Sequence, residues 1–85
     1  MATQIFYIIP NPLYYPPNGS IFQAYMVEET EGLCVPCWHD WNKALVHLEQ
    51  KFGKNSKFGV TSSNIEYLQE ELATKPLSIK IKFMD

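Results

Sequence analysis

The stretch Leu-Ser-Ile-Lys-Ile-Lys-Phe at residues 77–83 alternates apolar and polar side chains from end to end. A period of two is typical of a β-strand with one buried and one wet face, because successive side chains point to opposite sides of a sheet. The stretch therefore predicts a strand whose two lysines face water. Lysines also suit a strand at a sheet edge, where they discourage pairing with another chain.

Two amphipathic helices are predicted ahead of this strand. The first has one apolar stripe at helical spacing, formed by Trp41, Ala44, Leu45, Leu48 and Phe52. Asp40 is its expected N-cap and Gly53 its expected stop. In the second helix a capping box of Ser63 and Glu66 precedes a stripe of Ile65, Leu68 and Leu72. Two such narrow stripes cannot bury their apolar faces on each other alone, so both helices must cover a sheet.

Earlier residues supply the remaining strands. Residues 4–9 are rich in β-branched and aromatic side chains and lead into Pro10, which predicts a first strand. Residues 21–27 and 33–38 predict a hairpin with a turn between them. Pro36 would place the second hairpin strand at an edge of the sheet, or near that strand's end, because proline cannot donate to a ladder.

Together these elements predict an α+β fold with the order β-β-β-α-(β)-α-β. Both helices are expected on one face of a small, mainly antiparallel sheet of three to five strands. The strand in brackets is residues 57–61, whose pattern fits either a very short strand or an anchored loop. Residues 1–85 are expected to form a single domain, because so short a chain can bury only one modest core.

Composition argues against several functional classes. The chain has 7 lysines, no arginine, 9 acidic residues and a net charge of -2. Proteins that read nucleic acids concentrate cations and depend on arginine, so no nucleic-acid partner is expected. Prolines interrupt the longest apolar stretch, and the start lacks the basic segment of a secretory signal. We therefore expect a cytoplasmic protein that does not contact membranes.

The segment Cys34-Val35-Pro36-Cys37 supports an alternative function. A Cys-x-x-Cys pair can perform thiol exchange, and with His39 and His47 it could supply the four ligands of a structural zinc site. However, the helical stripe begins after both cysteines, and an extended strand would point their sulfurs to opposite faces. Packing is therefore the favoured role of both side chains, and no cofactor is expected.

The first 27 residues carry no charged side chain but hold six of the twelve aromatic residues. Within them, residues 11–19 form a loop braced by prolines. Its rings either bind a partner or fold back onto the sheet, and the sequence favours neither reading. The candidate partner-binding residues are Leu13, Tyr14, Tyr15, Pro16, Pro17 and Trp38. Trp41, in contrast, is expected in the core.

No arrangement typical of a catalytic site is present, so we do not expect an enzyme. The sequence instead favours a small non-catalytic protein-interaction module, such as a regulator or inhibitor of a larger protein. It would bind through the aromatic loop and an adjoining sheet edge. Self-association into a homodimer through that edge is the closest variant, and a thiol-redox or structural-zinc protein is the alternative.

Overall fold

The computed structural model describes residues 4–10, 24–30, 32–54, 57–75 and 78–85. Its elements, in chain order, are β1 (Gln4–Pro10), β2 (Val27–Glu29), β3 (Gly32–Trp38), α1 (Trp41–Phe52), β4 (Phe58–Asn64), α2 (Ile65–Ala73) and β5 (Ile79–Phe83). This confirms the α+β class and the predicted order of strands and helices. The bracketed segment is a full strand, β4, which pairs with β1 along all seven of its residues.

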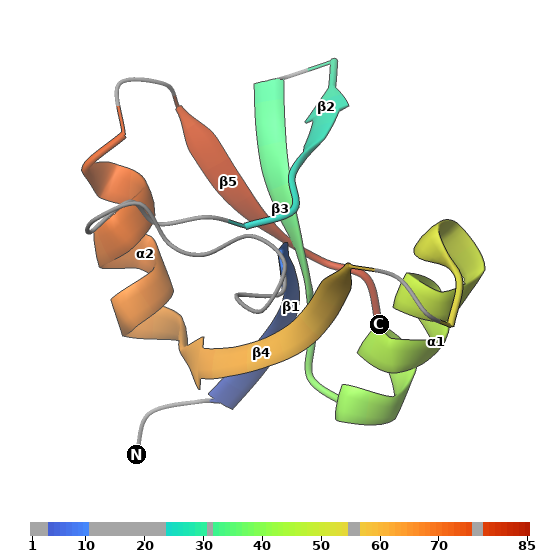
Figure 1. Cartoon of the computed structure of the whole chain (residues 1–85). Coiled ribbons are helices and arrows are strands. Elements are labelled where there is room, and N and C mark those ends of the chain that lie inside the picture. The colour runs from blue at the N-terminus through green and yellow to red at the C-terminus, as the bar shows by residue number, and fades with distance from the viewer. Residues whose placement is uncertain (1–3, 11–23, 31, 55–56, 76–77) are drawn as a thin grey trace.

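The five strands form one sheet in which β3 is central (Figure 1). Along one side β3 pairs antiparallel with β2 and then with β1, and along its other side it pairs parallel with β5. β1 in turn pairs antiparallel with β4. Among the described strands, β2, β4 and β5 each pair with a single neighbour; β4 forms one edge of the sheet and β5 an edge on the other side of β3.

Of the two alternatives predicted for Pro36, the edge strand is wrong, and Pro36 is the third residue from the end of β3. It is buried inside the central strand, where the pairing of β1 with β3 stops after Tyr7 opposite Cys37. The next residue of β1, Ile8, would lie opposite Pro36, which has no N–H to donate. The Ile8 carbonyl instead accepts a hydrogen bond of 2.7 Å from the backbone N–H of Tyr25. The proline is tolerated because another segment supplies the missing donor.

The predicted hairpin is present, but its first strand is shorter than expected. β2 comprises only Val27–Glu29, and residues 24–26 are not part of a strand. The backbone N–H of Tyr25 is bonded to Ile8 of β1, which explains the difference. Pairing with β3 begins only two residues later, at Val27. The predicted residues 21–23 lie outside the described part of the chain.

The two helices lie on opposite faces of the sheet, so the prediction that both cover one face is wrong. Successive residues of β1 belong to different cores: Ile5 and Tyr7 pack with residues of α2, whereas Phe6 and Ile8 pack with residues of α1. Figure 1 shows α2 and α1 on either side of the strands. The fold is therefore a three-layer arrangement with the sheet in the middle.

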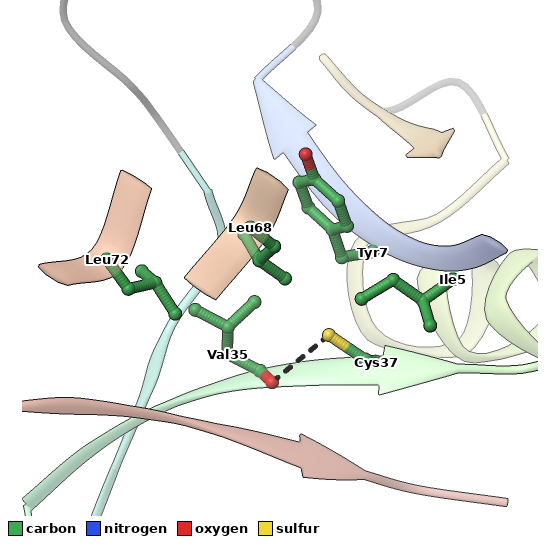
Figure 2. Packing of buried hydrophobic residues seen from close by; sticks show 6 residues of the cluster. All are labelled: Ile5, Tyr7, Val35, Cys37, Leu68 and Leu72. Carbon is green, nitrogen blue, oxygen red and sulfur yellow. Dashed lines mark hydrogen bonds between the residues drawn. The ribbon is translucent and has the colours of Figure 1, made fainter. Parts of the chain in front are cut away.

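Each helix closes its own hydrophobic core. The α2-side core consists of Ile5, Tyr7, Val35, Cys37, Leu68 and Leu72, which converge from β1, β3 and α2 (Figure 2). The α1-side core consists of Ile8, Trp38, Ala44 and Leu48. Half-buried aromatic rings close its rim, with Phe52 stacked on Phe58 at a centroid distance of 4.5 Å. Splitting the apolar side chains over two faces leaves each core small.

The roles of the two tryptophans are the reverse of those expected. Trp38 is only 3% exposed and belongs to the α1-side core, where its ring lies 4.9 Å from that of His47. Trp41, the first residue of α1, is 47% exposed. The large ring that fills the space under α1 is thus that of Trp38, at the end of β3. The ring of Trp41, on the helix itself, is not part of this core.

The helix boundaries follow local signals. The Asp40 side chain caps α1 by accepting a 2.7 Å hydrogen bond from the N–H of Asn42, and Gly53 ends the helix with a φ of 90°. Both features confirm the prediction. The cap of α2 is Asn64 rather than Ser63, because the Asn64 side chain accepts a 2.6 Å bond from the first turn. The predicted capping box is therefore wrong by one residue.

We expect Trp38→Ala to destabilise the protein far more than Trp41→Ala. Removing a buried tryptophan costs about 3–5 kcal/mol through lost burial and the cavity that remains. Removing an exposed one costs about 0.5 kcal/mol or less. Urea unfolding of both variants, followed by far-UV circular dichroism, measures the difference. Trp38→Phe serves as a milder control if the alanine variant does not fold, and equal losses at both positions would contradict the placement of the rings.

Candidate functional site

A groove with a volume of about 630 Å³ lies between α2 and the edge strand β5. Its apolar lining comes from both elements and comprises Ile65, Leu72, Ala73, Ile79, Ile81 and Phe83. Its polar lining comprises Gln69, Lys75, Ser78 and Lys80. The groove is therefore an open depression between α2 and β5 that apolar and polar residues line together.

The backbone of β5 is paired on only one side among the described residues. The N–H of Met84 donates to the carbonyl of Cys37 at 2.9 Å, so the backbone groups of Met84 face β3. Because backbone direction alternates along a strand, the N–H and C=O groups of Ile79, Ile81 and Phe83 face away from β3. These outward groups form an edge to which another extended chain can add.

Apolar side chains along this edge remain partly accessible. Ile79 and Ile81 pack against the α2-side core but are only half-buried, and Phe83 is 36% exposed. The cause is that α2 is short. Only two of its own residues, Leu68 and Leu72, are buried against the sheet. One helix of nine residues does not cover the whole face of β3 and β5. The groove is the part of that face that α2 leaves open.

The charged side chains of the groove lining are both lysines, Lys75 and Lys80. Lys82 on the same strand pairs with Glu29, and this hydrogen bond and the charge of Glu29 raise the pKa of Lys82. The carboxylates of α2 are absent from the lining; they are Glu66, Glu70 and Glu71. The charged residues among those that line the groove are thus lysines, in a chain of net charge -2.

A second polar arrangement lies where β5 ends. Asp85 accepts a 2.8 Å hydrogen bond from the backbone N–H of His39, and its other carboxylate oxygen lies 3.0 Å from His39 Nδ1. The His39 ring also stacks on Phe83 with a centroid distance of 4.2 Å. Although desolvation opposes the shift, the hydrogen bonds from His39 hold the pKa of Asp85 below its usual range. These contacts tie the end of β5 to the start of α1.

The two cysteines are free and lie on opposite faces of β3. Cys37 is fully buried in the α2-side core, where its thiol donates to the Val35 carbonyl at 3.5 Å (Figure 2). Burial raises the pKa of the Cys37 thiol to about 12. Cys34 is half-buried and points the other way. A raised pKa and divergent sulfurs are the opposite of what thiol exchange requires.

The histidines do not join the cysteines in a site. His39 is bound to Asp85 beyond the end of β3, and His47 packs on Trp38 in the layer of α1. The part of the chain that the structure describes contains no group of three His, Cys, Asp or Glu residues placed to hold a metal ion. No geometry here supports the zinc alternative.

The sequence-predicted partner-binding residues divide into two groups. Five of them, Leu13, Tyr14, Tyr15, Pro16 and Pro17, lie outside the described residues. The sixth, Trp38, is buried and lacks the exposed surface that a partner contact needs. Its assignment as an anchor is therefore corrected to a core role.

Sequence reasoning missed the groove residues on α2 and the segment after it, notably Gln69, Ala73, Lys75 and Ser78. None of them belongs to a motif. One signal was available, because the α2 stripe has only three apolar residues while the strand of residues 77–83 has four. That imbalance indicates that the helix leaves part of the strand uncovered.

Comparison with protein-family models, curated proteins and solved structures gives no match. No described helix is long and apolar enough to cross a membrane. Inference about function therefore starts from the groove, the open edge of β5 and the chemistry of the side chains around them.

We expect the two thiols to differ strongly in reactivity. With a pKa of about 12, Cys37 holds roughly a thousandfold less thiolate at pH 8 than an unperturbed cysteine, and it is also buried. In native protein at pH 8, Ellman's reagent should modify Cys37 far more slowly than Cys34. The variants Cys34→Ala and Cys37→Ala assign each rate, and urea should make both thiols react quickly. Equal, rapid modification of both variants without urea would contradict this arrangement.

Asp85 should make stability depend on pH. Its pKa is lower in the folded than in the unfolded protein, so its contribution is fully present above the unfolded pKa of about 3.9. That contribution is lost as pH falls through the folded pKa. Asp85→Asn should therefore lower the urea midpoint at pH 7 and have a smaller effect below pH 3.

The control for this experiment is a double-mutant cycle with His39→Ala. Because the carboxylate acts partly through the His39 ring, the effect of Asp85→Asn should be smaller in the His39→Ala background. A loss that is the same at both pH values, or the same in both backgrounds, would contradict the role assigned to the contact between Asp85 and His39.

Proposed function

We propose that this chain is a small non-catalytic protein-interaction module that binds a partner polypeptide along the outer edge of β5. The observation that carries the proposal is the apolar groove beside a strand whose outward backbone groups no described strand uses. An extended segment placed there would form main-chain hydrogen bonds with Ile79, Ile81 and Phe83. Its side chains on one face would enter the groove against α2.

The physical chemistry of the edge supports binding. The outward N–H and C=O groups of β5 can form directional hydrogen bonds with an added strand. The half-buried Ile79 and Ile81 offer apolar surface that binding would remove from water. The other edge of the sheet is less suitable. β4 carries the polar run Thr61, Ser62 and Ser63, and its apolar Val60 packs against the α1-side core.

The uncharged loop of residues 11–19 is a second contact in this proposal. Its rings and prolines lie outside the described residues, so the support comes from the segments that flank it. Ile9 before it and Ala24 after it both pack against the α2-side core. These two described residues therefore pack on the face of the sheet that carries the groove. Tyr14 and Tyr15 would extend the contact surface on that face.

Selection from a phage-displayed random peptide library tests the proposal. Peptides that bind should slow amide hydrogen exchange at Ile79, Ile81 and Phe83 in NMR spectra of the ¹⁵N-labelled protein. Ala73→Trp should abolish their binding, because a bulky ring would fill the groove. Gln50→Trp is the matched control, since Gln50 is a neutral, exposed residue of α1. Failure to select any binder, or selected binders that leave these amides unprotected, would overturn the proposal.

A further inference from the structure

We propose that the contact between Asp85 and His39 is a latch on the end of β5, and that release of this latch lets β5 open locally and expose the thiol of Cys37. This device does not depend on the proposed function. Three features of the structure support it: the way β5 is held in the sheet, the way its end is fastened, and the position of Cys37 behind that end.

β5 is held in the sheet by few buried groups. None of its five residues, Ile79–Phe83, is fully buried, and β3 is the single described strand with which it pairs. In contrast β1, which also pairs with β3, contributes the fully buried Ile5 and Ile8 and pairs with β4 as well. Segments that bury little apolar surface can open while the rest of a protein stays folded. Local opening is therefore expected at β5 before β1.

The latch lies just beyond the end of β5. His39 engages both carboxylate oxygens of Asp85: its backbone N–H donates to one at 2.8 Å, and its Nδ1 lies 3.0 Å from the other. The side chain of Asp85 is only 6% exposed, so water competes little for these contacts. The His39 ring also stacks on Phe83, the last residue of β5. His39 thus holds both the carboxylate and the last ring of the strand.

Cys37 lies directly behind this end of β5. It is opposite Phe83 in the parallel pairing of β3 with β5, and its carbonyl accepts a 2.9 Å hydrogen bond from the N–H of Met84. Its side chain is fully buried in the α2-side core, with Tyr7 opposite it on β1. When residues 83–85 move away, Cys37 loses its cover on the side of β5 and keeps it on the side of β1. Reagents in water then reach the thiol.

Thiol labelling in dilute urea tests the latch. In protein that carries Cys34→Ala, Cys37 is the single thiol. Ellman's reagent at pH 8 should modify it slowly, at a rate that hardly changes with urea below the unfolding transition, because a local opening exposes little surface. Asp85→Ala should raise this rate by about threefold to tenfold, since both contacts of the carboxylate are lost. Asp85→Asn, which keeps one acceptor oxygen, should raise it less. Amide exchange of Met84, followed by NMR, should accelerate with the labelling.

The matched control is Ile8→Val, which shortens a side chain in the α1-side core. It should lower the urea midpoint of global unfolding but leave Cys37 labelling in dilute urea unchanged, because that core stays folded when β5 opens. Labelling that rises steeply from the first addition of urea, or that Ile8→Val accelerates as much as Asp85→Ala does, would overturn the proposal, since global unfolding would then be the route to the thiol. Absence of labelling below the transition would overturn it too. Faster labelling of the Asp85→Ala variant without faster exchange at Met84 would do the same, because another segment would then be the one that opens.

Discussion

The second half of the central strand β3, residues 35–38, is buried, and the rest of the structure is arranged around that constraint. Its residues alternate between two cores, with Val35 and Cys37 under α2 and Trp38 under α1. Along its sides it pairs with β2, β1 and β5. Water reaches little of residues 35–38, so each backbone group there needs a protein partner and the side chains must be apolar. Pro36 is compatible with this position because Tyr25 bonds the carbonyl that would otherwise lack a donor.

The elements of the fold could be predicted because their signals are local. Alternation in residues 77–83, the stripe of α1 and the caps at Asp40 and Gly53 depend only on neighbours in sequence. The sides on which the helices pack could not be deduced from either stripe, since a stripe shows that a helix has a buried face but not which face of a sheet receives it. The run Phe6–Ile9 did hold the information. Consecutive apolar residues are typical of a strand buried on both faces, which requires a layer on each side.

The candidate site, too, could be predicted only where its signals are local in the sequence. Lys80 and Lys82 predicted an exposed edge, and β5 is an edge of the described sheet. The groove depends on where the short α2 helix stops relative to a strand that pairs in parallel with β3, which is a long-range property. Trp38 shows the limit most clearly. Its position just before a helix resembles that of Trp41 in sequence, yet only the folded sheet shows that one ring fills a core and the other faces water.

Lysines at alternate positions of β5 are a feature that disfavours aggregation through this edge of the described sheet. An open apolar edge invites pairing with any extended chain, including another copy. Positive charge at alternate positions would place like charges opposite each other in a pair of identical strands, so the sequence of this edge disfavours self-pairing. Lys82 also pairs with Glu29 of β2, so a lysine that discourages pairing between copies of the edge strand at the same time ties β5 to a neighbouring part of the fold.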